Sequence, residues 1–140
     1  MKNYFFGFIL LILFACEKAK DVPTEIQMEI LAEGSTSWIG DSLPPYPEGT
    51  PQVSIMRAKI PPQAKLRMHK HPVINAGVLI KGTLTVISDK GDTLRLKAGD
   101  PIIELVNRYH FGMNEGDEVA EIIVVYAGEV NTPITIAKED

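Results

Sequence analysis

The sequence is poor in residues that form covalent or metal cross-links: its 140 residues include one cysteine and three histidines. Because the single cysteine is Cys16, no disulfide can form within the chain. Basic residues are also in the minority, with 14 against 18 acidic ones and a formal net charge of −4. We therefore expect no nucleic-acid partner, because binding to a phosphate backbone calls for a basic face.

No hydrophobic run reaches the roughly 20 residues that a transmembrane helix needs. The apolar stretch from Phe5 to Phe14 follows Lys2 and ends just before Cys16, which predicts a signal peptide over residues 1–16. Residues 13–16 resemble a bacterial lipobox, although Phe14 stands where a smaller residue is usual. The resemblance implies lipidation of Cys16 and a membrane-anchored lipoprotein of the cell envelope, periplasmic or on the outer surface. Without lipidation the protein would be secreted.

Helical signals are missing too, since no apolar stripe exceeds two helical turns and no segment repeats. Instead, short apolar segments alternate with turns that contain glycine, proline or aspartate, a pattern typical of an all-β sandwich or barrel. The predicted strands are Gln52–Ile60, Lys65–His71, Ala76–Lys81, Thr83–Ser88, Thr93–Leu96, Ile102–Val106, His110–Asn114 and Val119–Ala127. A barrel pairs its strand edges and encloses an interior that can hold one small ligand.

The residues before the first of these strands divide into a tether, a strand and an arm. Residues 17–24 are charged and lack periodicity, which predicts a tether. Residues 25–32 alternate between polar and apolar side chains (Ile26, Met28, Ile30), which predicts a strand with one buried face. Residues 33–52 are rich in Gly, Ser, Thr and Pro, and we expect an arm that Trp38 and Tyr46 hold against the barrel. The folded domain is thus expected to span residues 25–140.

The three histidines are the strongest candidates for a functional site. His69 and His71 flank Lys70, and on a strand such residues point to the same face. Two neutral imidazoles side by side can share a divalent cation, and His110 would complete a set of three if its strand faces theirs. An isolated H-x-H pair can also be a coincidence on the surface, so the pair alone leaves both interpretations open.

The spacing around these histidines resembles the two sequence motifs of the cupin superfamily. The first motif, G-x5-H-x-H-x3,4-E-x6-G, is matched by His69, His71, Asn75 and Gly82, with Gln63 in place of the leading glycine. The second motif, G-x5-P-x-G-x2-H-x3-N, is matched by Gly99, Leu105, Asn107, His110 and Asn114, with Leu105 and Asn107 replacing the motif proline and glycine. The resemblance covers roughly residues 53–127.

This resemblance implies an all-β fold, a cupin-type double-stranded β-helix (jelly-roll) barrel. It also implies one divalent metal ion, iron, manganese, nickel, copper or zinc, held by His69, His71 and His110. The glutamate of the first motif is Asn75 here, and an amide oxygen is a weaker, neutral ligand than a carboxylate. Asn75 could bind the metal weakly, orient a bound water or cap a turn.

Glu104 is a second candidate for a role at the metal. It precedes His110 by six residues and shares a strand face with Ile102 and Val106. An acid among apolar neighbours is poorly explained by solvent exposure, so we expect the Glu104 side chain to point inward rather than to lie on a solvated face. There it could bind the metal, hydrogen-bond a ligand imidazole or act as a general base.

Two functions remain open at this point. The resemblance implies either a metal-dependent enzyme acting on a small organic acid or sugar, with Glu104 as the catalytic base, or a non-catalytic binding module for a small ligand or metal at the cell envelope. A barrel that has lost its metal is a third alternative. Since cupins commonly form dimers, a homodimer is also implied, with residues 27–30 and 38–46 as candidate contacts.

Overall fold

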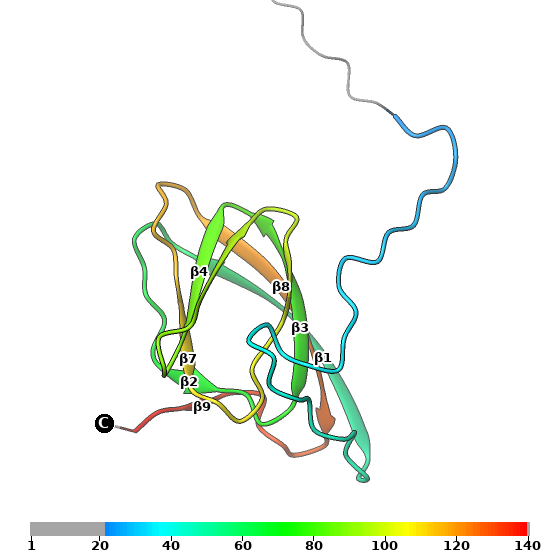
Figure 1. Ribbon diagram of the computed structural model, residues 1–140, viewed down its shortest axis with the longest axis vertical. Coiled ribbons are helices and arrows are strands. Elements are labelled where there is room, and N and C mark those ends of the chain that lie inside the picture. Colours follow the sequence, from blue (N-terminus) through cyan, green and yellow to red (C-terminus); the bar gives the residue numbers. More distant parts are fainter. Residues whose placement is uncertain (1–21, 140) are drawn as a thin grey trace, which may run out of the picture.

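The computed structural model describes residues 22–139, whose body is two antiparallel sheets packed into a barrel (Figure 1). One sheet has the strand order β1-β8-β3-β6 and the other has the order β5-β4-β7-β2-β9. The strands are β1 (Pro51–Ile60), β2 (His69–Lys70), β3 (Ile74–Lys81), β4 (Thr83–Ser88), β5 (Thr93–Lys97), β6 (Pro101–Ile103), β7 (His110–Met113), β8 (Ala120–Glu129) and β9 (Ile136–Ala137). The described residues form no helix, and the predicted all-β fold is confirmed.

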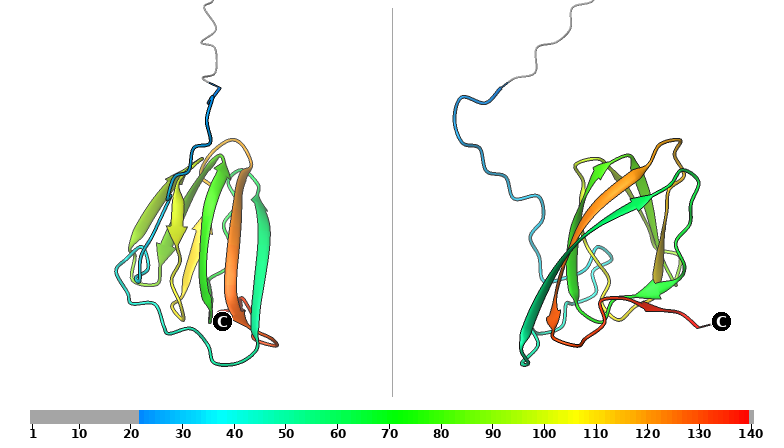
Figure 2. Two further views of the ribbon diagram at one scale, coloured as in Figure 1. Left: turned by 90° about the vertical axis from the view of Figure 1, so that its right-hand side faces the viewer. Right: turned by 180° about the vertical axis from the view of Figure 1, so that it is seen from behind.

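The core lies between the two sheets and follows from the alternation along each strand. In β8 the buried positions are every second residue, as the alternation of side chains on a strand requires. In the left view of Figure 2, β1, β8 and β3 lie side by side as neighbours in one sheet. The buried core residues are Ile60, Val73, Leu79, Leu84, Val86, Leu96, Ile102, Ala120, Ile122, Val124 and Tyr126. Full burial of each large aliphatic side chain stabilises the fold by about 1.5–3 kcal/mol.

The strands predicted over residues 52–127 all correspond to observed strands, with two differences. The segment Lys65–His71 is mostly irregular, because only His69–Lys70 forms β2 and Lys65 makes an isolated bridge to Met113. The short strand β9 was not predicted, and it pairs with β2 through Lys70 and Ile136. Two residues are too few to produce a recognisable alternation.

Two residues that replace motif glycines adopt the left-handed backbone conformation that favours glycine. Gln63 has φ of 59° and Asn107 has φ of 57°. Asparagine tolerates this conformation better than most residues, and the Asn107 N–H donates a hydrogen bond to the carbonyl of His71 at 2.7 Å. The Gln63 amide donates to the carbonyls of Glu115 and Gly116. The substitutions therefore keep the turn geometry of the motif.

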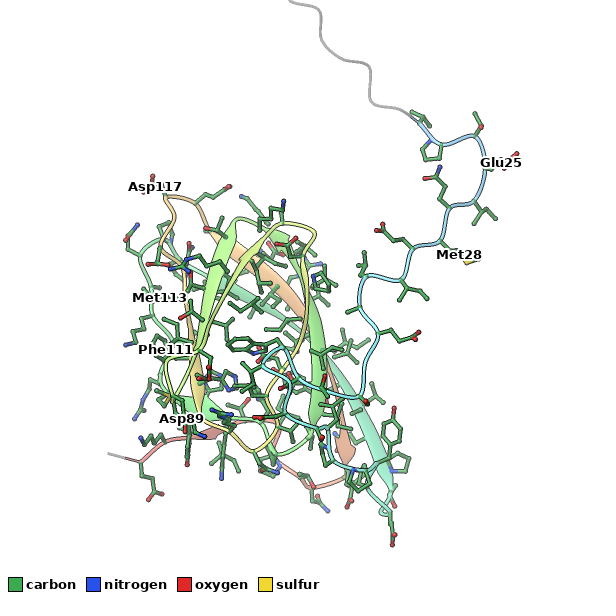
Figure 3. All side chains as sticks on the ribbon, in the orientation of Figure 1. Glu25, Met28, Asp89, Phe111, Met113 and Asp117 are labelled. Carbon is green, nitrogen blue, oxygen red and sulfur yellow. The ribbon has the colours of Figure 1, made fainter. Side chains whose placement is uncertain are left out.

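The strand predicted over residues 25–32 is absent, so that prediction is wrong. The segment runs away from the body of the molecule, as the positions of Glu25 and Met28 in Figure 3 show. Ile26 and Met28 are 92% and 94% exposed. Alternation gives a segment one apolar face, but a strand also needs a partner, and residues 25–32 pair with no strand of the described chain.

The proline-rich arm is held at its tryptophan but not at its tyrosine. The backbone N–H of Trp38 donates to the carbonyl of Ile103 at 3.0 Å, and the indole packs against the core, as expected. Tyr46 is 79% exposed, so the expectation that it anchors the arm is wrong. The predicted signal peptide, Cys16 and most of the predicted tether lie outside the described residues. Within residues 22–139, no helix has the length and apolar character to cross a bilayer.

Candidate metal centre

The three histidines converge inside the barrel from two neighbouring strands. His69 in β2 pairs directly with His110 in β7, and His71, just past β2, bridges to Val106. The three ring centroids are 4.7–5.1 Å apart. One ligand atom from each ring lies within 4.8 Å of the others. The set predicted from spacing is therefore assembled in space.

Burial excludes the alternative that the H-x-H pair is a coincidence on the surface. Within the pair, His71 is only 5% exposed and His69 is half-buried, and their partner His110 is 2% exposed. In β7, His110 and Gly112 are buried, while Phe111 and Met113 lie on the outer side of the barrel (Figure 3). His69 and His71 line the same cavity as His110.

Each imidazole is oriented by a backbone carbonyl. The Nδ1 atoms of His69, His71 and His110 lie 2.7, 2.7 and 3.0 Å from the carbonyl oxygens of Arg67, Ile134 and Arg108. A carbonyl can only accept a hydrogen bond, so each Nδ1 carries the proton and donates. Each Nε2 then has a free lone pair, which is the tautomer that a metal-binding histidine needs.

The protonation state of the rings also suits a metal. Burial lowers the pKa of His69 and His110 below the ordinary histidine value, and it lowers the pKa of His71 to about 4. The three side chains are thus neutral near pH 7, and a divalent ion need not displace protons from them.

Glu104 points inward, as the sequence predicted. Its Oε2 lies 3.5 Å from Nε2 of His110, and its side chain is 10% exposed. Burial raises the pKa of Glu104 to about 7, since a carboxylate loses hydration in the barrel interior. Glu104 is therefore a carboxyl group held beside the three histidines, where it can take part in binding or proton transfer.

Asn75 lies between Glu104 and Tyr126 in a row across three adjacent strands. Its backbone carbonyl accepts a hydrogen bond from Glu104, and it pairs in register with Tyr126. The side chain is 1% exposed, and its amide donates to the carbonyl of Val73. Its Oδ1 has no hydrogen-bond partner within residues 22–139. An unpaired buried acceptor costs about 1–3 kcal/mol, so Oδ1 is available to a bound ligand or water.

The donor set fits a first-row transition metal. Three neutral imidazole nitrogens with a carboxyl group beside them combine nitrogen and oxygen donors, whereas sites for calcium or magnesium use oxygen ligands alone. Tyr126 completes the surroundings, with its ring centroid 5.3 Å from that of His71. Burial raises the pKa of Tyr126 to about 12, so its hydroxyl stays protonated.

A cluster of ion pairs around Arg108, in the loop between β6 and β7, supports His110 at the start of β7. The Arg108 guanidinium lies 2.7, 3.2 and 3.5 Å from carboxylate oxygens of Asp41, Asp89 and Asp92. The same residue offers its carbonyl to the ring of His110. Sequence reasoning missed this support, because the partners lie on two segments distant from Arg108, the arm and the turn between β4 and β5, and share no local pattern.

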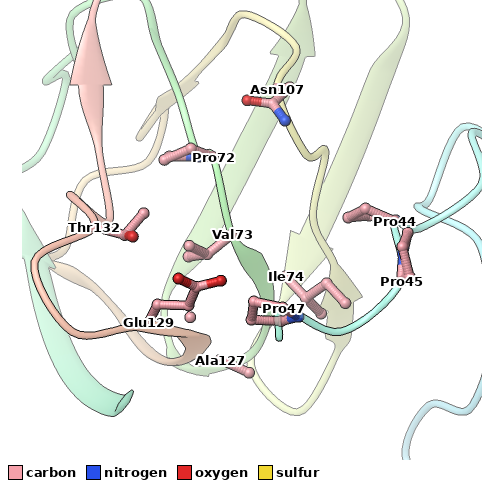
Figure 4. Close-up of a pocket in the computed structure, with 11 residues that line it drawn as sticks. Pro44, Pro45, Pro47, Pro72, Val73, Ile74, Asn107, Ala127, Glu129 and Thr132 are labelled. Carbon is pink, nitrogen blue, oxygen red and sulfur yellow. The ribbon is translucent and has the colours of Figure 1, made fainter. Parts of the chain in front are cut away.

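A second cleft lies between the arm, the start of β3 and the end of β8. Pro44, Pro45 and Pro47 line one side of it, and Val73 and Glu129 lie on the other (Figure 4). The cleft has a volume of about 190 Å³ and shares no residue with the histidine site. Few polar groups converge in it, so it has the character of a packing seam rather than a site for chemistry.

A comparison with family models finds a match to a cupin domain, Cupin_2, over residues 56–126, about half of the chain. This range contains all three histidines, Asn75 and Glu104. No curated protein matches the sequence.

Many solved structures resemble the barrel. An oxalate oxidase in complex with the substrate analogue glycolate shares 24% identity at a TM-score of 0.53, covering 61% of this chain and 45% of that one. The DMSP lyase DddQ from Ruegeria pomeroyi DSS-3 shares 16% sequence identity at a TM-score of 0.55, and the match covers 61% of this chain and 43% of that one. A cupin-superfamily sugar phosphate isomerase from Silicibacter pomeroyi DSS-3 shares 20% sequence identity at a TM-score of 0.53, and the match covers 64% of this chain and 58% of that one. The chain spans less than two thirds of each of these proteins, and the similarity shows a shared fold.

Proposed function

The chain belongs to the cupin domain family, and on this premise we propose that it holds one divalent transition-metal ion on His69, His71 and His110. The observation that carries the proposal is the shared orientation of three rings that line one cavity. Each Nδ1 is held by a carbonyl, and the ligand atoms lie within 4.8 Å of one another. Asn75 and Glu104 are the candidates for an additional ligand.

We propose further that the site serves a metal-dependent enzyme acting on a small organic acid or sugar. A bound divalent ion supplies a Lewis acid for an oxygen of the substrate. Glu104, beside His110 and shielded from water, would serve as the general base. One similar structure, an oxalate oxidase, holds the substrate analogue glycolate, a small carboxylic acid, and this supports the organic-acid alternative.

The second candidate is a binding module for a small ligand or metal without turnover. The scarcity of acid–base groups favours it: besides the histidines, Glu104 and Tyr126 are the only ionisable side chains among the described residues that line the cavity. The two candidate functions predict different effects of the variant Glu104→Gln. In an enzyme this variant abolishes turnover, whereas in a binding module it changes only ligand affinity.

Titration of the full-length chain with Co²⁺ tests the metal proposal. We expect one ion per chain and visible absorption bands of nitrogen-ligated Co²⁺, because the three Nε2 lone pairs are already oriented. Addition of one equivalent of Zn²⁺ should remove the bands by competition, since zinc binds nitrogen ligands more tightly than cobalt does. Bands that are absent, or that require many equivalents of Co²⁺, would contradict a preformed site.

We also propose that Cys16 is lipidated and anchors the protein at the cell envelope. Support comes from the sequence alone, in which the single cysteine ends the apolar segment of a signal peptide. Mass spectrometry of the mature N-terminal peptide should show acyl chains on Cys16. An unmodified Cys16, or cleavage elsewhere, would contradict the anchor.

A homodimer is proposed from the outer face of the four-stranded sheet. Val53, Ile55, Ile80 and Val125 on this sheet are 40–73% exposed, an unusual apolar surface for a monomer. The uncovered segment that contains Met28 gives a second apolar surface on the same chain, so two copies can cover each other's exposed residues. Light scattering should give the mass of a dimer, and Ile55→Lys should reduce it to that of a monomer.

A further inference from the structure

The cavity that contains the histidines has a polar end and an apolar end. The polar groups gather around the histidines: Glu104 lies 3.5 Å from His110, and the Thr135 hydroxyl lies 3.2 Å from Nδ1 of His71. The remaining wall is aliphatic and includes Ile60, Leu84, Val86, Ile122 and Val124. A ligand in this cavity meets the metal ligands at one end and only hydrocarbon at the other.

Met56 and Leu66, 38% and 39% exposed, form one exposed part of the wall of this cavity, which we call its entrance. Among the other described lining residues only Thr135, next to His71, is exposed, and the rest are buried or half-buried. Both entrance side chains are apolar. Thr135 adds a neutral hydroxyl, so no exposed part of the wall offers a positive charge to a ligand.

The cavity is small. Its volume is about 120 Å³, which is below the range of about 300–1,000 Å³ found for sites of drug-sized ligands. An engineered apolar cavity of about 150 Å³ in another protein accepts benzene. The ligand is thus a molecule of a few carbon atoms.

The charge of the wall decides between ligand classes. No lysine or arginine stands among the described residues that line the cavity, and the ionisable groups other than the histidines are acids, Glu104 and Tyr126. One anionic group can lie against a metal ion, but a second would be buried against hydrocarbon or acids without a positive partner. Several hydroxyl groups, as in a sugar, would lack hydrogen-bond partners on the aliphatic wall.

Building on the proposed metal site, we infer that the ligand is a small carboxylic acid with one charged head and an aliphatic body. The head binds at the histidines, and the body packs between Leu84 and Val124 beneath the entrance. The wall selects against dicarboxylates and phosphates, because its exposed residues, Met56, Leu66 and Thr135, offer no positive charge. This inference narrows the substrate to an acid and excludes sugars.

The test compares two acids with the same metal-binding head on the Co²⁺-loaded, full-length chain. 2-Hydroxybutyrate and malate both carry an α-hydroxy carboxylate, and malate adds a second carboxylate. Spectroscopic titration of the Co²⁺ bands should show 2-hydroxybutyrate binding at least about tenfold more tightly than malate. Equal affinities, a preference for malate, or no change with either acid would overturn the inference.

A variant at the entrance makes the test independent of how strongly each acid binds metal in water. Met56→Arg places a positive charge at a partly exposed position, and it should shift the affinity ratio toward malate by about tenfold or more. Gln52→Arg adds the same charge to β1 outside the cavity and should leave the ratio unchanged. An unchanged ratio in Met56→Arg would overturn the inference.

The two proposals fail in distinguishable ways. If Co²⁺ does not bind, both the metal site and this inference are contradicted. If Co²⁺ binds to the histidines but malate is preferred, the metal site stands and the assignment of the ligand class is wrong.

Discussion

Replacing His110 with alanine is expected to raise the dissociation constant for Co²⁺ by more than about 100-fold, because even the outer partners of metal ligands contribute roughly 10–100-fold. His110 is 2% exposed and pairs directly with His69 across β2 and β7. Its loss leaves two imidazoles, and no fourth histidine exists in the chain to replace it. Dialysis against buffered Co²⁺, followed by metal analysis, measures the effect.

Glu104→Gln is the matched control for this prediction. It removes the charge 3.5 Å from His110 but keeps the size of the side chain and all three histidines. We expect a change in metal affinity of less than about tenfold, the lower end of the effect of residues next to metal ligands. If Glu104→Gln loses the metal as completely as His110→Ala, Glu104 is an essential ligand and the three-histidine site is incomplete without it. If His110→Ala retains the metal, the proposed site is wrong.

Replacing Asn114 with alanine is expected to lower the free energy of unfolding by roughly 2–4 kcal/mol. The buried amide of Asn114 donates hydrogen bonds to the carbonyls of Ile60, Pro61 and Glu118, and its Oδ1 accepts one from the N–H of Gly116. Alanine leaves these four backbone groups without their partner. The midpoint of thermal unfolding should fall by roughly 10 °C, as measured by circular dichroism.

Gln63→Ala provides the comparison for Asn114. Gln63 also donates its amide to this turn, to the carbonyls of Glu115 and Gly116, but both bonds are exposed to solvent. Water can replace the lost donor, so we expect a change within about 1 kcal/mol. An Asn114→Ala variant as stable as Gln63→Ala would show that the buried hydrogen bonds of Asn114 do not hold the turn.

The location of the histidine site could be predicted from the sequence because it depends on local rules. Alternation on a strand places His69 and His71 on one face, and the motif spacing brings in His110. The inward direction of Glu104 followed in the same way from its apolar neighbours Ile102 and Val106. Each of these arguments requires only that the segment be extended and that one of its faces be buried.

The features that escaped prediction depend on contacts between distant segments. The carbonyl that orients His71 belongs to Ile134, 63 residues away, and the Arg108 guanidinium reaches Asp41 across 67 residues. Residues 25–32 fail for the opposite reason: their alternation is correct for a strand, but no edge within the described chain pairs with them. A local pattern describes the preference of a segment and does not identify its partner.

The central claim is that three imidazoles hold one metal ion through Nε2, and anomalous scattering from crystals of the Zn²⁺-loaded protein tests it most directly. The account predicts a single strong peak inside the barrel, about 2.0–2.1 Å from Nε2 of His69, His71 and His110. A peak elsewhere on the molecule, or a crystal grown with Zn²⁺ in which the three rings have no peak between them, would contradict it.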